Sequence, residues 1–381
     1  MYTSYLNYST IFASQMFLMR QFITYLLCLS FGFVFSQEQP TRSYFDINYF
    51  SGNIALHNND ILHLIKGHPE GVILSWNKKS FGKKDWEQRY GYPDWGVSLA
   101  YQDLKNDVLG NNYSVYGHYN FYFLKRDLML RIGQGLAYNT NPYNKEDNYK
   151  NVAFGSTILS ATYLMLNYKK ERLFDRFGVQ AGLSFLHYSN ANVRAPNTSV
   201  NTIAFNVGVT YNLDETDPEF IKTVTKEKFT QPIKYNLVFR SGINESDVIG
   251  SGQYPFYILS AYADKRLSHK SALQLGTDVF FSMFLKELIY YKSVAFPEEN
   301  VSGDEDYKRV GVFAGHELFI NKMSVVTQVG YYVYYPYHFE GRTYLRIGLK
   351  RYFGEKIFGA LTLKSHGAKA EAVELGVGIR L

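Results

Sequence analysis

The feature that most constrains this chain is an alternation of apolar and polar residues with a period of two, which recurs along the sequence past Glu38. The final stretch, EAVELGVGIRL, places aliphatic side chains on one face and Glu374, Gly376, Gly378 and Arg380 on the other. Side chains of a β-strand point alternately to the two faces of a sheet. The pattern therefore predicts many strands that each have one apolar and one polar face.

Two folds share this period, the soluble β-sandwich and the transmembrane β-barrel. Soluble strands average about 5–6 residues, whereas strands that cross a membrane need about ten. The alternating runs here reach the longer value, and the 34 tyrosines and 29 phenylalanines against 10 prolines suit strands with aromatic belts. We predict an all-β, antiparallel, transmembrane outer-membrane β-barrel of about 14 strands, within a range of roughly 12–16. A secreted sandwich is the alternative.

The connections between the predicted strands alternate in length. Short polar turns such as LKRD at 124–127 alternate with longer loops such as 190–200 and 284–307. Outer-membrane barrels have short turns on the periplasmic side and long loops outside. The strand that leads into 190–200 is therefore predicted to run outward. The segment 213–231 is too long for a periplasmic turn, but no low-complexity linker divides the chain, so residues 37–381 are predicted to form a single barrel domain.

The first residues have the pattern of a secretory signal. Arg20 supplies a positive charge, residues 22–35 are mostly apolar, and a small residue and polar residues follow at once. We predict that residues 1–36 are a signal peptide that directs export, with Met16 and Met19 as alternative translation starts.

Other classes of chemistry find little support in the sequence. The single cysteine, Cys28, lies in the predicted signal peptide, so disulfide and thiol chemistry are not expected in the exported chain. The net charge of +6 is too mild to indicate a nucleic-acid partner. His57, His63 and His68 lack metal-ligand spacing and are interpreted as loop residues, and no phosphate-binding glycine loop occurs. We therefore predict neither a metal nor a cofactor.

Two neighbouring strands place polar side chains on an apolar face. In residues 179–189, His187 and Ser189 share the face of valine, leucine and phenylalanine side chains. On the next strand, Asn201 shares the face of the apolar residues at 203–209. Polar groups are costly on a surface that faces hydrocarbon. Three of them at the external rim of one hairpin therefore need an explanation.

A histidine beside a serine offers a chemical explanation. The imidazole can take the hydroxyl proton while the oxygen attacks an ester carbonyl, and a third group can fix the tautomer of the ring. A site on the lipid-facing side could reach a substrate dissolved in the membrane. The alternative is that His187 and Ser189 are interfacial polar residues without chemistry, because the His-x-Ser pattern is short and common.

The same residues carry a resemblance. The run HYSNA at 187–191, the PN pair at 196–197 and a polar position on the next strand resemble the outer-membrane lipid A 3-O-deacylase family, PagL, whose Bacteroidetes relatives are often labelled acyloxyacyl hydrolases. The specific match covers roughly residues 170–212, and this chain is much longer than the small eight-stranded barrel of that family.

The resemblance implies roles for individual residues. His187 would be the base, Ser189 the nucleophile, and the backbone amide of Asn190 part of the oxyanion site. The position of the family's glutamate falls on Asn201. This is a departure, because asparagine can orient an imidazole but cannot stabilise its cation by charge.

The implied function is an outer-membrane esterase that removes an ester-linked acyl chain, at the 3-position, from lipid A in the outer leaflet. Arg194 would meet a lipid A phosphate, and Phe185 and Phe205 on the apolar face would contact substrate. Two other functions stay open: a pore or transport barrel without catalysis, and a structural or adhesin-type barrel that presents loops such as 284–307.

Overall fold

The computed structural model describes residues 42–217, 219–223, 229 and 231–381. The predicted signal peptide, both alternative starts and Cys28 lie outside these residues. The described part contains sixteen β-strands, all paired with antiparallel neighbours. The predicted all-β antiparallel barrel class is confirmed, and the number of strands lies at the upper end of the predicted range.

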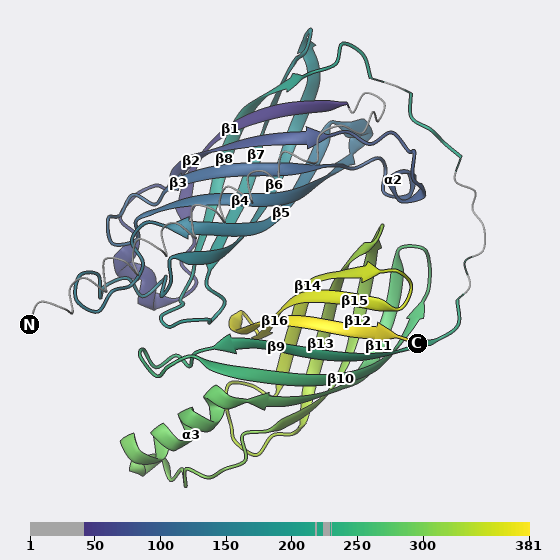
Figure 1. Ribbon diagram of the computed structural model, residues 1–381. Coiled ribbons are helices and arrows are strands. Elements are labelled where there is room, and N and C mark those ends of the chain that lie inside the picture. Colours follow the sequence, from purple (N-terminus) through teal and green to yellow (C-terminus); the bar gives the residue numbers. More distant parts are fainter. Residues whose placement is uncertain (1–41, 218, 224–228, 230) are drawn as a thin grey trace, which may run out of the picture. The chain divides into compact units, whose positions relative to one another are not determined.

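The strands close into two eight-stranded barrels (Figure 1), not into one ring. In the first barrel each strand pairs with the next and the eighth pairs back with the first; the second barrel closes in the same way. This differs from the single ring that we predicted over residues 37–381. The alternation of faces is identical for one large ring or two small ones, and only the pairing of β1 with β8 and of β9 with β16 distinguishes them.

The first barrel consists of β1 to β8. Its strands are β1 (Ser43–Ile54), β2 (Glu70–Lys78), β3 (Asp94–Asp103), β4 (Asn111–Phe123), β5 (Leu128–Asn139), β6 (Ile158–Phe174), β7 (Phe177–Ser189) and β8 (Val200–Asn212). Short helices lie in its connections: η1 (Asn59–Leu64), α2 (Asp85–Arg89) and η2 (Leu124–Arg126).

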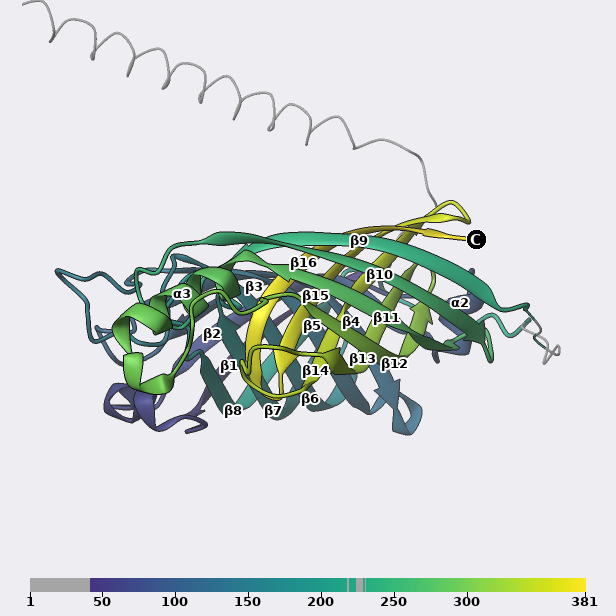
Figure 2. The same cartoon turned by 90° about the horizontal axis from the view of Figure 1, so that it is seen from below.

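The second barrel consists of β9 to β16, with helix α3 in a long connection at one end (Figures 1 and 2). Its strands are β9 (Lys234–Asn244), β10 (Tyr254–Arg266), β11 (Ser271–Ser282), β12 (Arg309–Ile320), β13 (Met323–Tyr334), β14 (Thr343–Phe353), β15 (Ile357–His366) and β16 (Lys369–Arg380). The helices are α3 (Met283–Ala295) and η3 (Pro297–Glu299). None of the described helices is long and apolar enough to cross a membrane.

The long segment 213–231, which the sequence did not explain as a turn, belongs to the connection between the two barrels. Phe229, near its end, packs against His269 of the second barrel with 4.5 Å between ring centroids, whereas the part around Phe220 packs on the first barrel. Phe220 stacks on Phe81 with 5.6 Å between ring centroids, and the amide of Ile221 donates to the carbonyl of Phe81. The length of this segment is thus explained by its place between two closed rings.

The barrels are apolar outside, and their interiors hold polar side chains together with clusters of buried apolar and aromatic ones. On β8, Ile203, Phe205 and Val207 are 52%, 77% and 59% exposed, whereas the alternate residues Thr202 and Asn206 are buried. This is the reverse of a soluble protein and the arrangement of barrels that lie in a membrane. The assignment of faces made from the sequence is therefore the one that the fold adopts.

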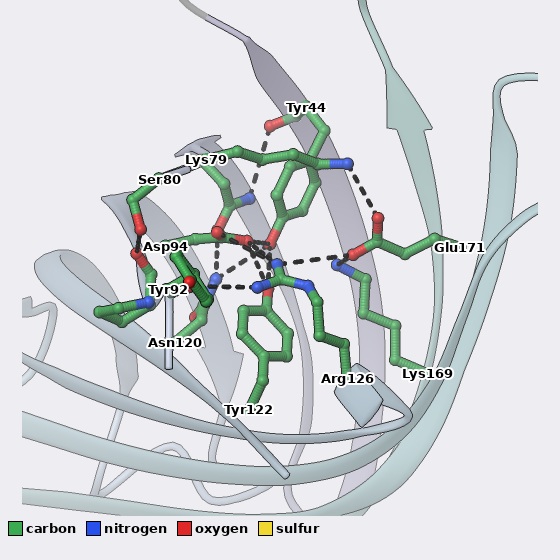
Figure 3. A network of polar contacts seen from close by, with 12 residues as sticks. Tyr44, Lys79, Ser80, Tyr92, Asp94, Asn120, Tyr122, Arg126, Lys169 and Glu171 are labelled. Carbon is green, nitrogen blue, oxygen red and sulfur yellow. Dashed lines mark hydrogen bonds and ion pairs between the residues drawn. The ribbon is translucent and has the colours of Figure 1, made fainter. Parts of the chain in front are cut away.

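The interior of the first barrel is filled by side chains. Fully buried Arg131 and Asp46 form an ion pair at 2.6 Å. Near the end of the barrel where β1 begins, Arg126 bonds Asp94 at 3.2 Å and Tyr122 donates to the same carboxylate (Figure 3). An eight-stranded ring has an interior just wide enough for such side chains.

The second barrel has the same kind of interior. Buried Arg346 bonds Asp278 at 2.8 Å and Glu374 at 2.6 Å, and Lys350 bonds Glu317 at 3.1 Å. Each ring is therefore held from inside by buried ion pairs between its strands.

Candidate active site

The first site contact lies between two paired strands of the first barrel. The register of β7 and β8 sets His187 directly opposite Asn201, with both side chains on the outer face. The Nδ1 atom of His187 lies 2.6 Å from Oδ1 of Asn201. Because an amide oxygen only accepts, Nδ1 carries the hydrogen in this orientation of the amide. The lone pair of Nε2 is then available to take a proton.

Ser189 is the last residue of β7 and follows His187 on the same face by strand alternation. It is 5% exposed, and its Oγ accepts a hydrogen bond from the backbone amide of Ala191 at 3.1 Å. Within the part of the chain that the structure describes, no hydrogen bond joins Ser189 to His187. The structure thus brings His187 and Asn201 into contact and places Ser189 beside them.

The loop after Ser189 is held by its own asparagines. The amide of Asn190 donates to Oδ1 of Asn197 at 2.8 Å, and the side chain of Asn190 donates to the carbonyl of Arg194 at 2.6 Å. Ala191 and Asn192 both have positive φ, at 52° and 64°. Because the amide of Asn190 donates to Asn197, the group predicted to bind an oxyanion is already paired in this structure.

The loop between β5 and β6 packs against the loop that follows Ser189. A side chain at Gly155 would place its Cβ 2.6 Å from the carbonyl oxygens of Arg194 and Ala195, so glycine permits the close approach of the two loops. The amide of Thr198 donates to the carbonyl of Val152 at 3.2 Å. The side chain of Arg194 is exposed.

An apolar groove lies on the outer face next to the site. It has a volume of about 280 Å³ and is lined by outward residues of β7 and β8, including Leu183, Ile203 and Phe205, and by residues of β1. Ala55 lines the groove, and its amide donates to the carbonyl of Asn201 at 2.8 Å. Phe205, predicted to contact substrate, is therefore a groove residue. Phe185 lies opposite Ile203 on the same face.

Two family models match this chain, one in each barrel. Residues 70–210 match the model of the lipid A 3-O-deacylase (PagL) family, and residues 233–381 match that of the acyloxyacyl hydrolase C-terminal domain. Together the two spans cover most of the chain. The chain belongs to the PagL family. The first match lies within β2 to β8 of the PagL-type barrel, which carries His187 and Ser189, and the second begins one residue before β9.

Other comparisons add little about this PagL-family chain. No curated protein matches it. Solved structures that align with it include the outer membrane protein Omp33 of Acinetobacter baumannii, at 8% identity over 90% of this chain and 99% of that chain, with a TM-score of 0.18. A triple mutant of the Rhodopseudomonas blastica porin aligns at 9% identity over 90% and 99%, with a TM-score of 0.17. TM-scores this low carry no argument about fold or function.

One residue near the site was not recognised from the sequence. His57, interpreted above as a loop histidine, contacts the carbonyl of Thr198 at 2.9 Å. The contact joins residues 141 positions apart. No motif or spacing in the sequence could have indicated it.

Proposed function

We propose that this PagL-family chain is an outer-membrane esterase that removes the acyl chain ester-linked at the 3-position of lipid A. The observation that carries the proposal is the His187–Asn201 hydrogen bond, next to Ser189 and above an apolar groove on the outside of the barrel. An ester embedded in the outer leaflet would reach a site on this face, and a fatty acyl chain suits an apolar groove. The family descriptions of both barrels agree with this class of substrate.

The first half of the reaction uses the free nitrogen of His187. Ser189 Oγ turns from the Ala191 amide toward Nε2 of His187, gives up its proton and attacks the ester carbonyl carbon. The carbon–oxygen bond to the sugar then breaks. His187 returns the proton to the sugar oxygen, and the acyl group stays on Ser189 as an ester.

The second half repeats these steps with water. His187 takes a proton from a water molecule, the hydroxide attacks the acyl carbonyl, and the bond to Ser189 Oγ breaks as the proton returns to it. A fatty acid leaves and Ser189 is restored. Asn201 holds Nδ1–H throughout, so the ring keeps the orientation and the tautomer that both steps need.

Backbone amides after Ser189 would stabilise the negative carbonyl oxygen. The Ala191 amide already points at Ser189 Oγ at 3.1 Å, and the Asn190 amide becomes available when Asn197 releases it. Two donors near the carbonyl oxygen of the attacked ester match what an oxyanion site requires. The exposed Arg194 in the same loop would meet a lipid A phosphate.

The proposal is tested by incubating the purified barrel protein with lipopolysaccharide and analysing the lipid A by mass spectrometry. We expect the loss of one acyl chain, with the free fatty acid appearing in equal amount. Unchanged lipid A, from protein whose heat-dependent gel mobility shows an assembled barrel, would contradict the proposal.

Asn201 provides a prediction that concerns the departure from the family pattern. The variant Asn201→Glu is expected to raise kcat by about tenfold, because a charge-assisted hydrogen bond to the imidazolium is stronger than a neutral one by about 1–2 kcal/mol. The variant Asn201→Leu should lower kcat, since it keeps the approximate size but cannot accept from Nδ1. Both are measured by the rate of fatty acid release. Full activity in Asn201→Leu would remove Asn201 from the mechanism.

The pore alternative makes a different prediction. Each ring has eight strands, and buried ion pairs such as Arg131–Asp46 occupy the interior of the first and Arg346–Glu374 that of the second. Such an interior leaves no wide aqueous path. In planar bilayers we expect no step-like conductance from the assembled protein. Regular conductance steps that persist after repurification would favour the pore.

A further inference from the structure

His57 joins two parts of the site that lie far apart in the sequence. It stands in the connection between β1 and η1, and its side chain is exposed. Its Nδ1 lies 3.1 Å from the carbonyl oxygen of Ala55. Its Nε2 lies 2.9 Å from the carbonyl oxygen of Thr198 and 3.2 Å from Oγ of Ser199.

The geometry identifies what the ring must donate. A carbonyl oxygen only accepts hydrogen bonds, and a neutral imidazole carries a hydrogen on one nitrogen alone. The carbonyl oxygens of Ala55 and Thr198 face opposite nitrogens of the His57 ring, so the ring lies between two acceptors. A side chain with two N–H donors therefore suits this position.

The two carbonyls belong to two parts of the site, the groove and the start of β8, whose relative position matters for the proposed reaction. Ala55 lines the apolar groove, and its amide also holds the carbonyl of Asn201. Thr198 lies just before β8, where Asn201 accepts from His187. We propose that His57 is a positioning residue for the reaction at Ser189. Its contacts with the carbonyls of Ala55 and Thr198 link the wall of the groove to the residues just before β8, and this link keeps Asn201 aligned with His187. This inference rests on the proposed function.

The expected effect follows from how strongly catalysis depends on position. A displacement of about 1 Å can cost about a hundredfold in rate. The variant His57→Ala leaves the β7–β8 ladder intact and removes only the contacts of His57 with Ala55 and Thr198. We therefore expect kcat for fatty acid release to fall by about tenfold, with a smaller change in KM.

The test compares three variants with the wild type, each checked for barrel assembly by heat-dependent gel mobility. His57→Ala should lose activity, and His57→Arg should recover most of it, because a guanidinium can donate to two carbonyls. His63→Ala is the matched control, since His63 also contacts a backbone carbonyl, that of Lys150 at 3.0 Å, but not the loop of residues 190–199. It should keep wild-type activity.

A second readout does not depend on activity. Amide hydrogen exchange at residues 197–201 should quicken in His57→Ala and return toward the wild-type rate in His57→Arg. Equal kcat in wild type and His57→Ala, no recovery in His57→Arg, or an equal loss in His63→Ala would each overturn the role of His57. If the wild type itself releases no fatty acid, the proposed function fails, which is a distinct result.

Discussion

Replacing Ser189 with alanine is expected to lower fatty acid release from lipopolysaccharide by at least about a thousandfold, because the variant has no oxygen to attack the ester. The barrel should assemble normally. Ser189 ends β7, and within the described residues its Oγ accepts one hydrogen bond, from the amide of Ala191, so the strand ladder does not depend on it. The rate is measured by mass spectrometry of lipid A, and assembly by heat-dependent gel mobility.

The neighbouring strand offers a matched control for this variant. Ser160 on β6 pairs directly with Ser189 in the ladder, and its Oγ accepts from the side chain of Gln134 at 3.2 Å. Ser160→Ala makes the same chemical change without touching the proposed nucleophile and should retain activity. Release of fatty acid at equal rates by wild type and Ser189→Ala would show that Ser189 is not the nucleophile.

A second large effect concerns stability. Asp46 is fully buried inside the first barrel, where it bonds Arg131 at 2.6 Å and 3.0 Å and also accepts from Asn77 at 2.7 Å. In Asp46→Ala the arginine would remain buried without its counter-charge. Leaving one member of such a pair costs about 3–5 kcal/mol. We expect the free energy of unfolding, measured by urea titration in detergent, to fall by about this amount.

Two comparisons separate this effect from a general weakening of the barrel. The double variant Asp46→Leu with Arg131→Met removes both charges and should recover much of the lost stability. Asp127→Ala breaks an exposed ion pair, in which the side chain of Lys170 is 45% exposed and that of Asp127 is 39% exposed. It should change the free energy of unfolding by less than about 1 kcal/mol. A loss in Asp46→Ala no larger than in Asp127→Ala would contradict the account.

The sequence could predict the face of the sheet on which each site residue lies, but not the contacts between those residues. Alternation along a strand decides the face on which each side chain lies, so the sequence alone predicts that His187, Ser189 and Asn201 share the outer face. Placing His187 directly opposite Asn201 required the register of β7 and β8. Whether the Asn190 amide was free required the position of Asn197, seven residues along a loop whose turns follow no strand rule.

The amino-acid sequence by itself determined that this chain forms antiparallel barrel strands with an apolar outer face, because a period of two converts directly into two faces of a sheet. It also determined which polar residues interrupt that face. Only the tertiary structure decided that sixteen strands close as two rings and that His57 reaches Thr198. Ring closure and such contacts depend on which distant segments pair, and the free energy of that choice is spread over many long-range contacts that leave no local pattern.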